Sequence, residues 1–172
     1  MPEEQLRHLD SNNFYFGKSV TNYMLEADFI NGEWTNAVIK KNEPLQLEPS
    51  TAVFHYGQSI FEGIKAYKGE SDQVVIFRPQ ENYKRFNISA ERMQMPTVPE
   101  WLFMDGMKQL VKIEQDWIPK GEDHSLYIRP FMIATDPFIG VRPSALYKFM
   151  IILGPAGPYN VEAMKILIEK NY

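Results

Sequence analysis

The chain has 172 residues, and its 18 basic and 22 acidic side chains give a formal charge of −4. This length suits one domain, and 44% apolar and 13% aromatic residues suffice for a packed core. The acidic excess argues against a nucleic-acid-binding surface, and the lack of cysteine excludes disulfides and thiolate metal sites. No apolar run approaches the ~20 residues of a membrane span, and the charged start is unlike a signal peptide. We therefore expect a globular cytoplasmic protein that is not bound to a membrane.

The first 80 residues predict an arm followed by short strands and one short helix. Residues 1–20 are polar and are expected to form a tethered arm. Four segments have the composition of strands, namely residues 24–29, 33–40, 64–67 and 74–77. Asn31-Gly32 favours a tight hairpin between the first two, because both residues tolerate positive φ. Residues 45–49 are compatible with a further short strand, and near-helical apolar spacing predicts a short helix within residues 51–60.

The remainder of the chain predicts two helices and then strands. Pro79 suits the first turn of a helix, and apolar residues follow on one face at helical spacing: Tyr83, Phe86, Ala90 and Met93. A second helix begins near Pro99 and ends before Pro119. Three strands are expected after it, at residues 125–133, 146–154 and 164–172. Strands interrupted by paired helices favour an α+β fold, in which an antiparallel or mixed sheet packs against two main helices in two layers.

The sequence contains none of the common metal, nucleophile or phosphate-loop motifs. His8, His55 and His124 are far apart, and no second ligand stands at metal-binding spacing from any of them. No GxSxG, GxGxxG or GxxxxGK motif occurs. We therefore expect no metal site.

Two arginines stand out as candidates for anion binding. In residues 126–130, strand alternation places Tyr127 and Arg129 on one face. If that face is buried, Arg129 must meet a carboxylate, which comes either from an internal Glu–Arg pair or from a ligand. Arg85, in the helix that begins at Pro79, either reaches an anion such as phosphate or lays its stem over Phe86 with its head in water.

Four aromatic residues lie beside glycines or chain breaks: Phe16, Tyr56, Phe61 and Tyr159. Aromatic residues at such positions either pack in the core or wall a pocket where a ligand comes close to the backbone. The sequence leaves both interpretations open.

Five segments in register resemble the branched-chain amino-acid aminotransferases, which are fold-type IV enzymes dependent on pyridoxal phosphate. They are FHYGQSIFEGIKAY (54–67), FRPQENYKR (77–85), LYIRP (126–130), DPFIGV (136–141) and GPAGPY (154–159). The first and third segments favour the branched-chain members over D-amino-acid aminotransferases and aminodeoxychorismate lyases. The resemblance implies the small N-terminal α+β domain of such an enzyme.

The same resemblance implies roles for individual residues. Arg85 would bind the cofactor phosphate, and Tyr127 and Arg129 would lie on the substrate side of the cofactor, with Arg129 on the carboxylate of glutamate or 2-oxoglutarate. The other residues implied to contact leucine, isoleucine or valine are Phe16, Tyr56, Phe61, Ile139, Val141 and Tyr159. In the family, Tyr56 and the 139–141 loop are presented across a dimer interface, so a homodimer is implied.

The resemblance places the lysine that binds the cofactor covalently beyond Tyr172, so no catalytic residue is expected in this chain. Lys65 looks like an ordinary strand lysine and is not taken as a substitute. We expect residues 1–20 to be the arm, 21–159 the domain and 160–172 the start of an interdomain segment. On this hypothesis the chain is a truncated part of a transaminase, inactive alone and with weak or absent cofactor binding. A non-catalytic binding or dimerisation module on the same fold is the alternative.

Overall fold

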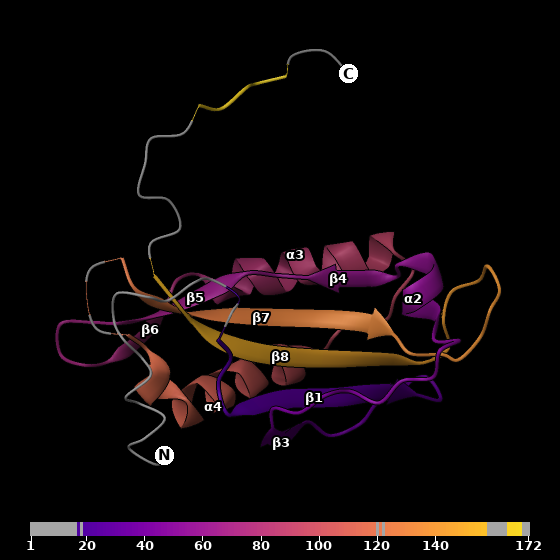
Figure 1. Cartoon of the computed structure of the whole chain (residues 1–172), viewed down its shortest axis with the longest axis horizontal. Coiled ribbons are helices and arrows are strands. Elements are labelled where there is room, and N and C mark those ends of the chain that lie inside the picture. The colour runs from indigo at the N-terminus through magenta and orange to yellow at the C-terminus, as the bar shows by residue number, and fades with distance from the viewer. Residues whose placement is uncertain (1–16, 18, 120, 122, 158–164, 170–172) are drawn as a thin grey trace.

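The computed structural model describes residues 17, 19–119, 121, 123–157 and 165–169, and within them an antiparallel sheet packs against helices on one side (Figure 1). The strands are β1 Tyr23–Ile30, β2 Glu33–Trp34, β3 Val38–Lys41, β4 Ser59–Phe61, β5 Ile64–Lys68, β6 Val74–Ile76, β7 Ser125–Ala134 and β8 Tyr147–Ala156. The helices are α2 Ala52–Tyr56, α3 Pro79–Arg92, the π-helical turn η1 Trp101–Asp105, α4 Gly106–Ile113 and the 3-10 turn η2 Gln115–Trp117. The predicted α+β fold of two layers is confirmed.

The long hairpin of β7 and β8 forms the middle of the sheet. The strand order is β2-β1-β8-β7-β5-β6, with β3 beside β1 and β4 beside β7. Ten residue pairs join β7 to β8, from Ser125 opposite Ala156 to Ala134 opposite Tyr147. All pairings between these strands are antiparallel.

The two faces of β7 differ in burial, and this difference locates the core. Alternate residues from Leu126 to Ala134 are buried, whereas the residues between them are half-buried. On the buried side, the rings of Phe86, Phe103 and Phe149 contact one another, with centroids 5.4 to 5.8 Å apart. Edge-to-face and tilted contacts of this kind stabilise a core beyond simple burial. Within the described residues the helices therefore cover one face of the sheet, and the other face is only half-buried.

Most of the predicted elements are confirmed, with differences at their ends. Asn31 and Gly32 form the hairpin turn with positive φ of 55° and 84°. The strand predicted over 33–40 is divided into β2 and β3, because Thr35 bonds to Asp28 through both its backbone N–H and its hydroxyl oxygen. These bonds replace the regular ladder at that point.

Two predicted strands do not form in the described residues, whereas the predicted short helix does. Residues 45–49 form no strand, because the backbone runs between Pro44 and Pro49, which lack an N–H group. The short helix predicted within 51–60 is confirmed as α2, which ends at Tyr56 because Gly57 takes a left-handed conformation with φ of 61°. The strand predicted over 164–172 is absent from its described part, where residues 165–169 pair with no strand.

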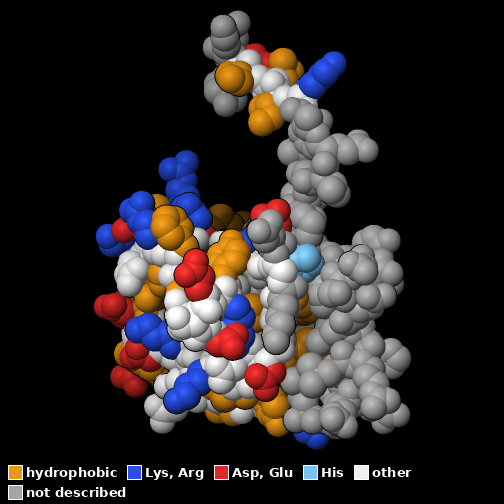
Figure 2. All heavy atoms as spheres, turned by 90° about the vertical axis from the view of Figure 1, so that its left-hand side faces the viewer, with side chains coloured by type: hydrophobic (Ala, Val, Ile, Leu, Met, Phe, Trp, Pro, Cys, Tyr) orange, Lys and Arg blue, Asp and Glu red, His pale blue; other side chains and the backbone are white. Residues whose placement is uncertain are grey.

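The predicted limits of the domain lie near the two ends of the chain. The arm at 1–20 and the segment at 160–172 fall largely outside the described residues, so these limits stay predictions. Within the described ranges, no helix is long and apolar enough to cross a bilayer, and no group of three His, Asp or Glu side chains is arranged for a metal. Figure 2 shows acidic and basic side chains interspersed on the face that it presents.

Candidate functional site

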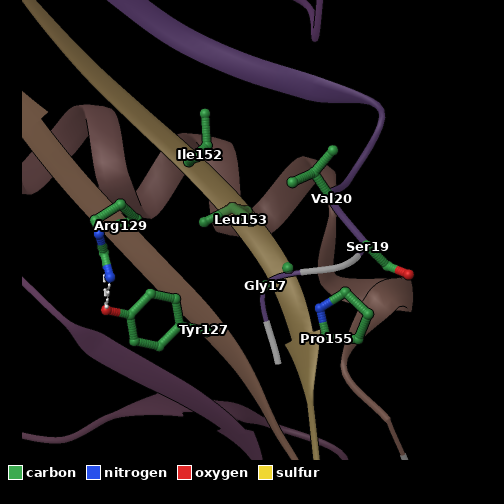
Figure 3. Close-up of a pocket in the computed structure, with 9 residues that line it drawn as sticks. Gly17, Ser19, Val20, Tyr127, Arg129, Ile152, Leu153 and Pro155 are labelled. Atoms are coloured by element: carbon green, nitrogen blue, oxygen red, sulfur yellow. Dashed lines mark hydrogen bonds between the residues drawn. The ribbon is translucent and has the colours of Figure 1, made fainter. Parts of the chain in front are cut away.

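Tyr127 and Arg129 form a hydrogen-bonded pair on the face of the sheet that the helices do not cover. Arg129 donates to the Tyr127 hydroxyl from Nε at 3.1 Å and from Nη2 at 2.8 Å, so that the two side chains point toward one another (Figure 3). The Arg129 guanidinium also lies over the Phe61 ring, 4.2 Å from its centroid. Hydrogen bonds from one side and an aromatic face on the other hold the cation in one orientation. The prediction that Tyr127 and Arg129 share a face is confirmed.

No carboxylate of the described residues pairs with Arg129. The ion pairs among these residues involve other cations, and within the described part of the chain the Tyr127 hydroxyl oxygen is the only side-chain acceptor of Arg129. A guanidinium that is half-buried without a counter-ion attracts an anion from solution. Of the two possibilities that the sequence left open for Arg129, the internal Glu–Arg pair is therefore not found within the described part of the chain.

A shallow pocket of about 170 Å³ opens beside this pair. Its lining combines the Tyr127–Arg129 pair with the end of β8 and with the segment before β1: Gly17, Ser19, Val20, Ile152, Leu153, Gly154 and Pro155 (Figure 3). Mostly apolar walls with one cation suit a small organic acid.

Two glycines make this arrangement possible, and neither was predicted to do so from the sequence. A Cβ on Gly63 would lie 2.6 Å from the Tyr127 hydroxyl oxygen, and a Cβ on Gly154 would lie 2.5 Å from the Ser19 carbonyl oxygen. Neither distance is tolerated by real side chains. The one sequence feature that pointed to Gly63 was its place in the Phe61-Glu62-Gly63 part of the family motif, and the motif gave no physical reason for the glycine.

Arg85 lies on α3 and is paired with Glu62, which precedes β5. Arg85 donates from Nε to one oxygen of Glu62 at 2.6 Å and from Nη2 to the other at 2.7 Å. Asn82 adds a bond from Nδ2 to Glu62 at 2.9 Å. The Glu62 side chain is 6% exposed and that of Arg85 is 65% exposed, so a buried anion holds a cation whose outer side faces solvent. An internal Glu–Arg pair was one of the two possibilities for Arg129, and the structure has such a pair at Arg85 and Glu62 instead.

The electrostatics of the pair are dominated by two opposing effects. Burial by itself raises the pKa of the Glu62 carboxyl, but the hydrogen bonds from Arg85 and Asn82 outweigh it, and the pKa lies below its ordinary value. The same pair raises the pKa of Arg85, which stays charged at any physiological pH. A guanidinium has five N–H donors, and Glu62 uses two of them, so Arg85 can bind a second anion such as phosphate.

The other predicted site residues are separate from this pocket or lie outside the described residues. Tyr56, Ile139 and Val141 are exposed and do not line the pocket, and Val141 is 94% exposed. Tyr56 ends α2, whereas Ile139 and Val141 stand on a loop held by Asp136, whose carboxylate accepts bonds from the Arg142 side chain at 2.8 Å and from the Ala145 N–H at 3.2 Å. Phe16 and Tyr159 lie outside the described residues.

Lys65 is exposed and its Cα is paired with that of Tyr127, so it shares the helix-free face.

Comparison with known proteins points to one family. No protein-family profile matches the chain. The branched-chain-amino-acid transaminase 1 of Bacillus subtilis (strain 168) is 45% identical over 168 residues, which is 95% of this chain and 47% of that protein. The chain resembles about half of a branched-chain aminotransferase. It thus spans about half the length of the curated relatives that it matches.

Solved structures of branched-chain aminotransferases share the fold as well. A T.th. branched-chain amino acid aminotransferase complexed with N-(5'-phosphopyridoxyl)-L-glutamate is 27% identical with a TM-score of 0.58, over 79% of this chain and 41% of that one. The same enzyme complexed with 4-methylvaleric acid is 29% identical with a TM-score of 0.55, over 74% of this chain and 40% of that one. The ligands of these branched-chain aminotransferases are a phosphopyridoxyl group joined to glutamate and a branched aliphatic acid.

Proposed function

We propose that the full-length protein transfers amino groups between branched-chain amino acids and 2-oxoglutarate with pyridoxal phosphate, and that this chain supplies one half of the site. Leucine, isoleucine and valine are the proposed donors. The observation that carries the proposal is Arg129, a half-buried cation held by Tyr127 and Phe61 without a carboxylate partner in the described part of the chain.

A transaminase of this kind must accept an acidic and an aliphatic side chain in one pocket. Arg129 would bind the side-chain carboxylate of glutamate or 2-oxoglutarate, with Tyr127 fixing its orientation. The Phe61 ring and the apolar wall at Ile152 would contact the aliphatic side chain of the alternative substrate. Glutamate and a branched acid in the two complexes of similar enzymes support this pairing.

The residues present fit a phosphate-bearing cofactor in part. Arg85 would bind the phosphate with the donors that Glu62 does not use, since a guanidinium fork matches a phosphate. Pyridoxal phosphate, when bound, supplies the electron sink that amino-group transfer requires. We propose that the lysine that binds it covalently belongs to another part of the full-length protein, and that Lys65 does not replace it.

We also propose a homodimer in the cytoplasm. The exposed apolar side chains of Ile139 and Val141 stand on a loop that Asp136 holds in place, as expected of a contact surface for a second subunit. Tyr56, also exposed, would lie at the same interface.

The test uses the full-length protein and this chain side by side. With leucine, 2-oxoglutarate and pyridoxal phosphate, the full-length protein should form glutamate, and no glutamate should form when the cofactor is removed. The 172-residue chain should form none under the same conditions. Absence of activity in the full-length protein would contradict the proposal and favour a non-catalytic binding module.

Borohydride reduction in the presence of pyridoxal phosphate, followed by peptide mapping, locates the lysine that binds the cofactor. We expect stoichiometric labelling in the full-length protein at a lysine outside residues 1–172, and none at Lys65. Labelling of Lys65 would show that this chain carries the reactive amine and would overturn the division of the site proposed here.

A further inference from the structure

Three consecutive residues lie against the two arginines of the proposed site and the tyrosine that holds one of them. Phe61 lies under the Arg129 guanidinium, Glu62 accepts two bonds from Arg85, and Gly63 leaves the space that the Tyr127 hydroxyl occupies. These residues join the end of β4 to the start of β5, both of which pair with β7. Phe61 is exposed while Glu62 is buried, so the segment reaches both sides of the sheet.

We propose that Phe61–Gly63 is a positioning element that orients both arginines, Glu62 fixing Arg85 for the phosphate and Gly63 admitting the Tyr127 hydroxyl that fixes Arg129. The inference rests on the proposed function, because it takes Arg85 and Arg129 as ligand-binding groups. It assigns separate tasks to Glu62 and Gly63, each of which acts through another side chain.

The burial of Glu62 is better explained by a role in positioning Arg85 than by a role in stabilising the fold. Removing a carboxylate from water is costly, and a well-packed apolar residue often stabilises a fold as well as a buried ion pair does. The partner, Arg85, is mostly exposed and would otherwise sample many rotamers. Two short bonds to Glu62, itself held by Asn82, confine the guanidinium to one plane.

Removing the charge of Glu62 should change phosphate binding in opposite directions, depending on whether Glu62 acts only as a nearby negative charge or orients Arg85. By simple electrostatics, a carboxylate beside Arg85 repels a phosphate, so its removal should tighten phosphate binding. If Glu62 instead serves to orient Arg85, its removal should weaken binding despite the gain in positive charge.

Gly63 acts on the other arginine through Tyr127. A methyl group at position 63 would lie 2.6 Å from the Tyr127 hydroxyl oxygen and 3.2 Å from two carbons of its ring, so the tyrosine side chain must shift. The hydroxyl is the acceptor of both side-chain bonds from Arg129, so the shift misplaces the guanidinium. Arg129 itself is left chemically intact.

The first experiment measures equilibrium binding of pyridoxal phosphate and of pyridoxal, which lacks the phosphate, to the full-length protein. We expect Glu62→Gln and Arg85→Ala each to weaken pyridoxal phosphate binding about tenfold or more, the size of one charge-assisted bond, with pyridoxal binding unchanged. Glu81→Gln is the matched control, because it removes the same charge from an exposed pair with Lys84 on the same helix and should change neither. Nitrogen-15 NMR of the Arg85 Nε–H in the ligand-free protein should show loss of its exchange protection in Glu62→Gln.

Two results of this experiment separate the inference from the proposed function. If Arg85→Ala weakens pyridoxal phosphate binding while Glu62→Gln leaves it unchanged or tightens it, positioning by Glu62 is overturned and the phosphate role of Arg85 stands. If Arg85→Ala has no effect, the phosphate role of Arg85 fails, and the inference for Glu62 fails with it.

The second experiment compares Gly63→Ala with Gly69→Ala in the full-length transaminase. In Gly69→Ala the three atoms nearest to the new methyl group all belong to the flexible side chain of Gln73, so it controls for the change from glycine to alanine. We expect Gly63→Ala to raise KM for 2-oxoglutarate about tenfold with little change in KM for leucine, and Gly69→Ala to change neither. Tyr127→Phe, which removes the hydroxyl without crowding, should give the same pattern as Gly63→Ala. Equal effects on both substrates, or no effect in either variant, would overturn the role of Gly63.

Discussion

Replacing Arg85 by alanine tests how the buried Glu62 is held. The substitution removes two bonds of 2.6 and 2.7 Å and leaves the carboxylate, 6% exposed, with Asn82 as its remaining side-chain partner. Loss of one partner costs ~3–5 kcal/mol in a buried pair, whereas an exposed pair contributes ~0–1 kcal/mol. Because one partner here is buried and the other mostly exposed, we expect a loss of about 2 kcal/mol in the free energy of unfolding.

The loss should depend on pH in a defined direction. In the native chain the pKa of Glu62 lies below its ordinary value, so the pair contributes stability above the unfolded pKa, and this is lost as pH falls through the folded pKa. Without Arg85, burial becomes the larger influence and raises the pKa of Glu62, so the variant gains relative stability by binding a proton. The difference between native chain and variant should therefore shrink as pH falls from about 7 toward about 4.

Urea unfolding followed by circular dichroism measures the difference at each pH. Lys84→Ala is a close control, because Lys84 neighbours Arg85, is 66% exposed against 65%, and pairs with the exposed Glu81. It should lose no more than about 0.5 kcal/mol. The reasoning is refuted if Arg85→Ala costs no more than Lys84→Ala, or if its cost does not vary with pH.

Two further substitutions test the core and a second buried carboxyl. Phe149→Ala should lower the free energy of unfolding by about 3–5 kcal/mol, because its ring is fully buried among other aromatic rings; a loss below about 1 kcal/mol in urea unfolding would contradict this packing. Glu114→Gln should become less stable relative to the native chain as pH falls from neutral values toward the ordinary pKa range of a glutamate. Burial raises the pKa of Glu114, and the hydrogen bond from the Tyr23 N–H only partly opposes this effect. The charged carboxylate therefore destabilises the native chain, and protonation removes that cost, which the glutamine variant never has. If the difference in the free energy of unfolding between the variant and the native chain does not vary with pH, ionisation of Glu114 does not destabilise the native chain.

Local sequence patterns predicted the elements whose signals are themselves local. Alternation in 125–133 placed Tyr127 and Arg129 on one face, Pro79 marked the start of α3, and Asn31-Gly32 marked a turn. The burial of α3 through Phe86 followed from helical spacing alone.

Contacts between segments that are distant in the sequence could not be predicted from those local patterns. Glu62 and Arg85 are 23 positions apart, and nothing in either neighbourhood indicated that they would pair. The space that Tyr127 requires at Gly63 depends on the pairing of β5 with β7, two strands that lie far apart in the sequence. Helical spacing predicted the short helix within 51–60 but not strand β4, which follows where a left-handed Gly57 ends the helix.

The most direct measurement of the central claim is the effect of Arg129→Ala on the two substrates of the full-length transaminase. If Arg129 binds the side-chain carboxylate, KM for 2-oxoglutarate should rise about 10- to 100-fold, as expected for the loss of a charge-assisted bond. KM for leucine should change by about threefold or less, since leucine has no such carboxylate. An equal loss for both substrates, or unchanged KM for 2-oxoglutarate, would contradict the account.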